Sequence, residues 1–392
     1  MDVIDPQVAR ALHNPRKRVY GARPAPRARL WIWLALGAGL MTLGSIAQQA
    51  LAAALPEERG EALYHSYDGG GVEVSGPALL VRKNVAEKFS MAAEYYVDSI
   101  SGASIDVVTN ASPYSERRTE YGFGVDWLYG DTLLSLAASQ SDENDYDATT
   151  FSFDIAHELF GNMTRINMGY SRGSDTVMRV DNDFEADIER ASYRLGVSQV
   201  LSPTLVSTVD YEAILDDGFL NNPYRSARVL GASVPERYPS TRTSHALALR
   251  LMKYWNERWS TRAEYRYFTD TWDVRAHTLE VGVNTYVRSG WLLEGHYRHY
   301  TQGNASFYAD NFDREFVYMA RDKELSSFNS HAVGGRLSIE LLPGSWGIVE
   351  RASLNVGYDF IRFDYDDFTD VRTGELYDFT THVVQIFVTA WY

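Results

Sequence analysis

The sequence contains no cysteine, which excludes a disulfide framework, a thiolate zinc site, an iron–sulfur cluster and a cysteine nucleophile. It also has no surplus of basic residues, since 37 Lys and Arg stand against 52 Asp and Glu and the formal net charge is −15. This balance argues against a nucleic-acid partner, because phosphate binding needs clustered basic side chains. Beyond residue 54 no segment is apolar for as long as a membrane-spanning helix requires.

Residues 1–54 differ from the rest of the chain in charge and composition. Seven basic residues precede an apolar run over residues 30–47, and small residues follow in an Ala-x-Ala pattern. This order is typical of a secretory signal peptide cleaved after Ala52 or Ala54. The alternative is an uncleaved membrane anchor, because the run is about long enough to span a bilayer. We expect residues 1–54 to be a signal peptide with an extended basic region and residues 55–392 to be the mature domain.

The mature region is rich in aromatic residues and alternates between apolar and polar positions. The whole chain has 26 Tyr, 17 Phe and 9 Trp. In residues 259–270 the sequence WSTRAEYRYFTD places Trp259, Ala263 and Tyr265 on one face and Arg262 and Glu264 on the other. A period of two predicts a strand rather than a helix. Similar segments of about ten residues or more recur from about residue 62 to the C-terminus.

The connections between these segments alternate between short and long. Short turns are expected near residues 83–88, 130–131, 161–162, 202–203, 256–258, 289–290 and 343–349. Long polar loops are expected near residues 100–115, 173–188, 215–241 and 304–326, and shorter acidic ones near 141–147 and 366–376. Short turns on one side and long loops on the other are typical of an outer-membrane barrel. The sequence therefore predicts an all-β, antiparallel, up-and-down transmembrane β-barrel of about 16 strands, with 14 strands as the alternative count.

The C-terminus supports a membrane barrel over a secreted sandwich or propeller. Val384, Ile386, Val388 and Ala390 alternate with polar positions up to the terminal aromatic Tyr392. This pattern is expected of a last strand that the outer-membrane insertion machinery recognises. The aromatic excess also fits, since Tyr and Trp gather where a barrel wall meets the membrane interfaces. We therefore expect the protein in the outer membrane of a Gram-negative bacterium, in contact with its lipid and lipopolysaccharide.

Several longer stretches resemble one proteobacterial family, catalogued as domain of unknown function 3570. They are residues 67–72 (YDGGGV), 95–109 (YYVDSISGASIDVVT), 139–146 (SQSDENDY), 218–228 (GFLNNPYRSAR), 263–272 (AEYRYFTDTW), 320–326 (ARDKELS) and 363–368 (FDYDDF). The resemblance covers nearly the whole mature region and implies an outer-membrane barrel. It also implies an envelope redox context, because the genes of such proteins often neighbour those of a small lipoprotein, a thioredoxin-like protein and a flavin transferase. It supplies no catalytic residues.

Alternation also selects side chains that are expected to point into the lumen of the barrel. If the apolar faces meet lipid, charged residues of the opposite face line the interior and pair between neighbouring strands. They either hold the shape of the wall or form a constriction that selects solutes by charge. The candidates are Arg250, Arg262, Glu264, Arg266, Glu280, Glu294, His296, Arg298, Arg336 and Glu340. Strands nearer the N-terminus offer a more acidic inward set, for which Arg165 and Arg194 are the expected counter-charges.

Two long loops are candidates for a plug or a ligand-binding surface. The loop at residues 215–241 offers Asn221, Asn222, Tyr224 and Arg225, and the loop at residues 307–325 offers Arg321 and Lys323. Three acidic clusters, at residues 142–147, 181–187 and 364–370, have the oxygen ligands that Ca²⁺ prefers but not the spacing of an EF-hand loop. The alternative for these clusters is a solvated loop. No resident metal or other cofactor is expected.

The sequence gives no sign of an enzyme. It lacks a G-x-S-x-G motif, and no short segment places Ser, His and Asp together. We therefore expect a channel or transporter for a small solute. The alternative is a barrel that does not conduct and instead serves as a structural partner of an envelope redox assembly, holding a small lipoprotein or a flavinylated or thioredoxin-like protein. An outer-membrane hydrolase is the least favoured hypothesis.

Overall fold

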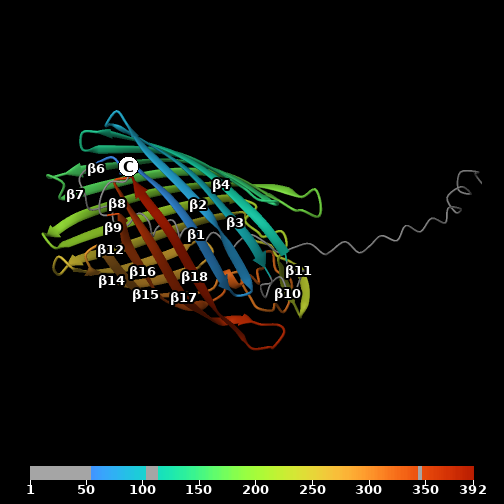
Figure 1. Ribbon diagram of the computed structural model, residues 1–392. Helices are drawn as coiled ribbons and strands as arrows, with labels where there is room; N and C mark the ends of the chain where they lie inside the picture. Colours follow the sequence, from blue (N-terminus) through green and yellow to red (C-terminus); the bar gives the residue numbers. More distant parts are fainter. Residues whose placement is uncertain (1–53, 103–113, 343–346) are drawn as a thin grey trace, which may run out of the picture.

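Antiparallel strands form a closed barrel in the part of the chain that the structure, a computed structural model, describes: residues 54–102, 114–342 and 347–392. Figure 1 shows the arrangement. The wall strands are β1 (Arg59–Gly69), β2 (Val72–Val85), β3 (Phe89–Gly102), β4 (Tyr114–Tyr129), β5 (Thr132–Asp142), β6 (Tyr146–Leu159), β7 (Thr164–Met178), β8 (Glu185–Ser202), β9 (Leu205–Gly218), β12 (Thr241–Tyr254), β13 (Trp259–Asp270), β14 (Arg275–Arg288), β15 (Trp291–Gln302), β16 (Phe328–Leu342), β17 (Arg351–Thr369) and β18 (Leu376–Trp391). The predicted signal peptide lies, except for Ala54, outside the described residues.

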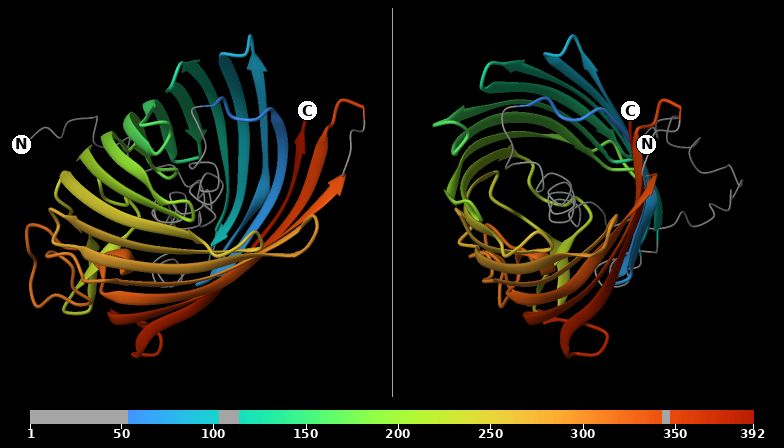
Figure 2. Two further views of the ribbon diagram at one scale, coloured as in Figure 1. Left: turned by 90° about the vertical axis from the view of Figure 1, so that its left-hand side faces the viewer. Right: turned by 60° about the vertical axis from the view of Figure 1, so that its left-hand side comes forward.

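The wall follows chain order, and its first and last strands close it. β1 pairs with β2 on one side and with β18 on the other, from Arg59 opposite Trp391 to Gly69 opposite Thr381. Every neighbouring pair in the ring is antiparallel, as tight connections between sequential strands require. Figure 2 shows the strands closing into a ring. The prediction of a 16-strand up-and-down barrel is confirmed.

The two ends of the barrel differ in their connections. One end, which we call the turn end, holds the C-terminus and joins strands through short turns such as residues 86–88, 130–131 and 203–204. The opposite loop end holds residues 219–240 and 303–327, which include the hairpin β10 (Ser226–Val229) and β11 (Ala232–Pro235) and the 3₁₀ turn η3 (Lys323–Leu325). In Figure 1, β10 and β11 lie at the end of the barrel away from the C-terminus. The alternation of short and long connections follows the predicted order.

Some segments expected to be loops continue as strands. β7 runs to Met178 and β8 begins at Glu185, so most of the loop expected at residues 173–188 belongs to the wall. The reason lies inside the barrel, where Val177 and Ile188 are buried against the long loops. Because the loops cover the interior at this level, apolar side chains on the inner face are stabilised there and the strands extend beyond the expected boundary.

The outer face of the wall is apolar. On β12, Leu247, Leu249 and Leu251 are 51%, 43% and 38% exposed, whereas the Arg250 side chain between them is 18% exposed. Exposed aromatics flank this apolar band at the turn end, including Trp127, Tyr129, Trp255, Trp259 and Tyr286. Such an apolar belt with aromatic borders is typical of a wall in contact with lipid.

No helix in the described part of the chain is long and apolar enough to cross a membrane.

Candidate functional site

Strand alternation places the ten predicted lumen residues on the face of the wall opposite the apolar band. They lie on five neighbouring strands: Arg250 on β12, Arg262, Glu264 and Arg266 on β13, Glu280 on β14, Glu294, His296 and Arg298 on β15, and Arg336 and Glu340 on β16. The register brings six of them into ion pairs between adjacent strands. Arg250 Nε lies 2.7 Å from Glu264 Oε2, Arg262 Nη2 lies 2.8 Å from Glu280 Oε1, and Arg336 pairs with Glu294.

Glycine lets a further side-chain contact span two strands instead of one. His296 on β15 lies opposite Gly334 on β16, which in turn lies opposite Asp359 on β17. His296 Nε2 reaches Asp359 Oδ1 at 2.8 Å across this glycine. A Cβ atom at Gly334 would lie 1.9 Å from Asp359 Oδ1, so a larger residue would force the pair apart. Sequence alternation identified His296 but not its partner Asp359, because the partner depends on the register.

A second pair of the same kind joins three strands in the more acidic part of the wall. Asp154 on β6 and Arg194 on β8 lie on either side of Gly169 on β7, and Arg194 Nη2 lies 2.9 Å from Asp154 Oδ1. Arg194 was expected as a counter-charge for this region. Arg165, the other expected counter-charge, donates from Nε to the Asn167 side chain at 3.1 Å.

Three predicted lumen residues are in no ion pair among the described residues. Arg266 carries its guanidinium 5.8 Å from the centre of the Phe268 ring. Arg298 lies opposite Glu280 in the register, but Glu280 pairs with Arg262 instead. Glu340 lies near Gly290 at the turn end. Arg266 and Arg298 are therefore the two wall cations of this set that are most available to an anion in the lumen.

The two long loops of the loop end pair with each other. We call residues 219–240 and 303–327 together the plug. Val229 bridges Phe312 in parallel fashion, and Arg237 bridges Met319 in antiparallel fashion. Ala227, Phe312 and Met319 form a small apolar core between the loops.

The plug also packs against opposite sides of the wall. One buried apolar cluster contains Leu220 and Phe307 of the plug together with Ile188 of β8 and Tyr365 of β17. In the strand order of the ring, β8 and β17 are seven positions apart out of sixteen. The core that the plug forms with the wall therefore reaches from β8 to β17 at the loop end of the barrel. The right-hand view of Figure 2 shows these segments inside the rim of the wall.

A buried polar network holds the two loops of the plug together. Arg225 of the first loop pairs with Asp322 of the second and lies 3.6 Å from Glu324. In return, Glu236 of the first loop accepts the backbone N–H of Arg321 at 2.6 Å and the hydroxyl of Tyr238 at 2.8 Å. Buried charges are stable only when paired and hydrogen-bonded, so these contacts define how the loops fit.

The remaining loop candidates also make contacts inside the plug or with the neighbouring connections. Asn221 donates to the Glu236 carbonyl and accepts from the Tyr238 N–H, and Asn222 accepts from the Tyr224 N–H. The Tyr224 hydroxyl accepts the N–H of Val180 from the β7–β8 loop at 3.0 Å.

Two cationic candidates are deeply placed in the second loop. Arg321 contacts the Asp310 carboxylate at 2.8 Å and donates to the Thr369 carbonyl in the β17 strand at 2.6 Å. Lys323 is buried in η3. The six loop candidates therefore make contacts that hold the plug together. Their role in binding a ligand stays a prediction.

The carboxyl group of Glu236 has a raised pKa. Its burial, and next the negative charge of Asp322, raise the pKa of Glu236 to about 8, although Arg225 opposes this effect. A carboxyl group with this pKa is mostly protonated at neutral pH. No local pattern in the sequence indicates Glu236, because its burial depends on how the two loops meet.

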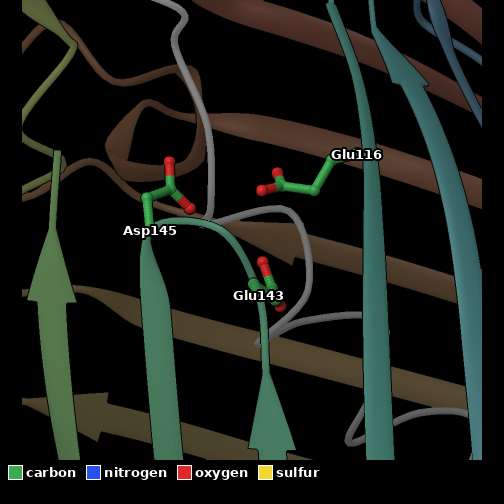
Figure 3. A group of neighbouring side chains, drawn as sticks. All are labelled: Glu116, Glu143 and Asp145. Carbon is green, nitrogen blue, oxygen red and sulfur yellow. The ribbon is translucent and has the colours of Figure 1, made fainter. Parts of the chain in front are cut away.

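Carboxylates also gather on the inner side of the β5–β6 connection. Glu116, Glu143 and Asp145 each offer an oxygen, and these oxygens lie within 4.8 Å of one another (Figure 3). Glu143 and Asp145 belong to the acidic cluster that was considered for Ca²⁺. The cationic group of Arg118 lies 4.0 Å from Glu143. This charge offsets part of the repulsion between the carboxylates.

Comparison with known proteins gives a family and a fold. Residues 34–348 match the family described as "Protein of unknown function (DUF3570)". No curated protein matches the chain. Among solved structures, a bacterial polysaccharide outer membrane secretin superposes with a TM-score of 0.50 at 9% identity, covering 86% of this chain and 99% of that one.

Two other similar structures have TM-scores below 0.5. CdiB from Escherichia coli has a TM-score of 0.47 at 12% identity, covering 86% of this chain and 64% of that chain. OpdK from Pseudomonas aeruginosa, solved with vanillate, has a TM-score of 0.43 at 9% identity, covering 86% of this chain and all of that chain.

Proposed function

This chain belongs to the DUF3570 family of proteins of unknown function, and we propose that it is an outer-membrane channel for a small solute that the plug holds closed. The observation that carries this proposal is the buried core that joins the plug to both β8 and β17. A ring of 16 strands encloses a lumen wide enough for water. A folded segment across its mouth would therefore control whether solutes enter.

The inner wall below the plug is suited to a charged or strongly polar solute. Paired charges such as Arg250 with Glu264 keep the wall polar without a strong net field. Arg266 and Arg298 add cationic groups outside the ion pairs of the described residues. Rings and patches of such charges select solutes by sign in other pores. We propose that anions pass the β13–β15 side of the lumen more easily than cations of the same size.

The outer membrane is the location that the wall supports. Its outward face is apolar over the middle of the strands, aromatic side chains flank this belt, and the last strand alternates up to Tyr392. These are the features of barrels that insert from the periplasmic side of an outer membrane. A non-enzymatic role is part of the proposal, since the wall and plug residues described above make structural pairs with one another.

Conductance of the folded full-length mature chain in a planar bilayer tests this function. We expect rare openings for the unchanged protein. We expect frequent openings for Arg225→Ala, because loss of this cation leaves Asp322 buried without its charge partner. Arg237→Ala is the matched control, since Arg237 lies in the same loop but pairs with Glu315 at an exposed position.

The comparison of the two variants decides the outcome. Heat-modifiable migration on a gel establishes that each barrel is folded before its conductance is measured. Frequent openings in Arg225→Ala but not in Arg237→Ala support a pore closed by the plug. Equal conductance of the two variants contradicts a pore closed by the plug. The absence of conductance in a folded Arg225→Ala barrel also contradicts it.

A further inference from the structure

Four histidines on the outer face of the wall repeat one contact with tyrosine. In each case the tyrosine hydroxyl lies 2.7–2.8 Å from Nδ1 of a histidine on the adjacent strand. The pairs are Tyr211 with His245, Tyr265 with His277, Tyr297 with His331 and Tyr358 with His382. We call these eight residues the Tyr–His band.

The geometry of the band is the same at every repeat. Each histidine lies opposite the residue two positions after its tyrosine, as His245 lies opposite Ala213 and His382 lies opposite Phe360. The strand pairs are β9/β12, β13/β14, β15/β16 and β17/β18, which together make up one continuous half of the ring. Four independent occurrences of one diagonal contact on successive strand pairs indicate a continuous surface feature.

The band lies where the apolar surface ends on the loop side. His245 is followed on the outer face of β12 by Leu247, Leu249 and Leu251, and His382 is followed on β18 by Val384, Ile386 and Val388. Each histidine is thus the first outward residue beyond an apolar run. In a barrel that spans a bilayer, this is the level at which lipid headgroups meet the wall.

The tyrosine contact occupies Nδ1 of each imidazole and leaves Nε2 to its surroundings. When a phenol O–H donates to Nδ1, the neutral imidazole carries its hydrogen on Nε2. The four histidines and their tyrosines are exposed, and in this tautomer the hydrogen on Nε2 is available to an acceptor in the surroundings of the barrel. Protonation of an imidazole keeps this donor and adds a positive charge.

The charged neighbours of the band favour an anionic partner at the level of the imidazoles. Arg275 is exposed and is the next outward residue beyond His277 on β14. The carboxylates of Asp364 and Asp378 lie further toward the loop end and are held by Arg362 at 2.7 and 2.6 Å. Asp217 on β9 also lies beyond the band, toward the loop end.

From this arrangement we propose that the Tyr–His band binds the phosphate groups of lipids in the loop-side leaflet. Phosphate oxygens are strong acceptors and carry negative charge, so they match a row of Nε2–H donors at headgroup level. The proposal rests on the membrane location of the barrel but not on its conductance. A second half of the wall, β1–β8, carries exposed tyrosines without histidines at the corresponding border.

Retention of lipid by the folded full-length mature chain in detergent tests the band. Native mass spectrometry would count bound phosphatidylglycerol and, separately, bound diacylglycerol, which lacks the phosphate. The test variant carries His245→Phe, His277→Phe, His331→Phe and His382→Phe, which keep a ring but remove the donor. The matched control carries Tyr64→Phe, Tyr121→Phe, Tyr170→Phe and Tyr193→Phe on the other half of the wall.

We expect the histidine variant to bind phosphatidylglycerol about tenfold more weakly, as loss of several hydrogen bonds to an anion implies. Diacylglycerol binding should be equal in all three proteins, and the tyrosine control should match the unchanged protein. Equal phosphatidylglycerol binding by a folded histidine variant overturns the proposal. Full displacement of the lipid by inorganic phosphate at low concentration would also overturn it, because the site would then take free anions.

The result is separable from the channel proposal. A barrel that is folded and retains phosphatidylglycerol through the band but never conducts contradicts only the channel. A barrel that conducts but binds both lipids alike contradicts only the band.

Discussion

The two ends of the barrel use the same strands in opposite ways. On β17 the inward residues near the loop end are Tyr365 and Phe363, those in the middle include Asp359, and Asn355 lies near the turn end. The aromatic residues are packed against the plug, whereas the Asp359 side chain stays 22% exposed on the inner face and Asn355 donates a hydrogen bond to the Ser353 hydroxyl. The rule that a barrel has a polar interior therefore holds only where the interior is wet.

This difference follows from what covers the inner face. At the loop end, residues 219–240 and 303–327 remove water from the wall, so apolar side chains gain free energy there by burial. At the turn end the connections are too short to fold inward, and ion pairs such as Glu294 with Arg336 remain at the lumen surface. The plug thus belongs to the folded core of the loop end, and the following predictions test how far the two ends differ.

The largest difference is expected between a plug ion pair and a wall ion pair. Arg225→Ala removes the cation that Asp322 and Glu324 share inside the plug. Loss of one partner of a buried pair costs about 3–5 kcal/mol. We expect hydrogen exchange of residues 219–240 to become faster by orders of magnitude while the amides of β12–β18 keep their protection. Unchanged exchange in the loop would show that the pair does not hold the plug.

A pH effect of the plug is expected next in size. Burial raises the pKa of Glu236 from its ordinary value of 4.5 to about 8. The stability that its protonation adds to the closed plug is fully present below the ordinary pKa and is lost as the pH rises through the raised one. We therefore expect the open fraction in a planar bilayer to increase as the pH rises from about 5 to about 9.

Glu236→Gln provides the check on this assignment. The amide stays neutral at every pH, accepts the Arg321 N–H with its oxygen and contacts the Tyr238 hydroxyl with its nitrogen. The pH dependence in this window should flatten in this variant and persist in Glu315→Gln, an exposed carboxyl of the second loop. A dependence that is equally steep in both variants would assign the titration to another group.

A smaller effect is expected for the glycine that lies between His296 and Asp359. Gly334→Ala places a Cβ atom 1.9 Å from Asp359 Oδ1. Such crowding costs about 1–3 kcal/mol, even though the Asp359 side chain can move. Urea unfolding from lipid vesicles measures the loss. Gly303→Ala is the matched control, because no atom lies within 4 Å of its added Cβ, and comparable destabilisation of the two variants would argue against a tight crossing at Gly334.

The smallest effect is expected for an ordinary pair of the wall. A double-mutant cycle on Arg250 and Glu264, which are part-exposed to the lumen, should give a coupling of about 0.5 kcal/mol and at most about 1 kcal/mol. The same cycle on Arg225 and Asp322 should give a several-fold larger value. Equal couplings would mean that the plug is as wet as the wall, and the contrast between the two ends would fail.

The structure of the wall can be predicted from the sequence better than the structure of the plug. Alternation and the order of short and long connections are local signals, so the strand number, the turn end and the inward position of residues such as Arg262 and Glu294 follow from them. Pairing partners depend on the register, which no local pattern fixes. For this reason Asp359 was not recognised as the partner of His296, and the sequence spacing of the four histidines does not show that they share the Tyr–His band.

The loop end was predicted least well for a related reason. Residues 173–188 are polar enough to resemble a loop, and only the plug that covers Val177 and Ile188 explains why the strands continue. Glu236 likewise gives no sign in the sequence, because its environment is formed by Arg225 and Asp322 from two loops that are far apart in the chain. Tertiary packing, rather than residue type, decides these positions.

Removal of one half of the plug tests most directly whether the plug closes a pore. Residues 219–240 would be replaced by a short Gly-containing turn between β9 and β12, and the folded barrel would be placed in a planar bilayer. We expect steady open channels with a preference for anions, which Arg266→Glu and Arg298→Glu together should reduce or invert. A correctly folded barrel that remains silent without residues 219–240 would contradict the claim that the plug closes a pore.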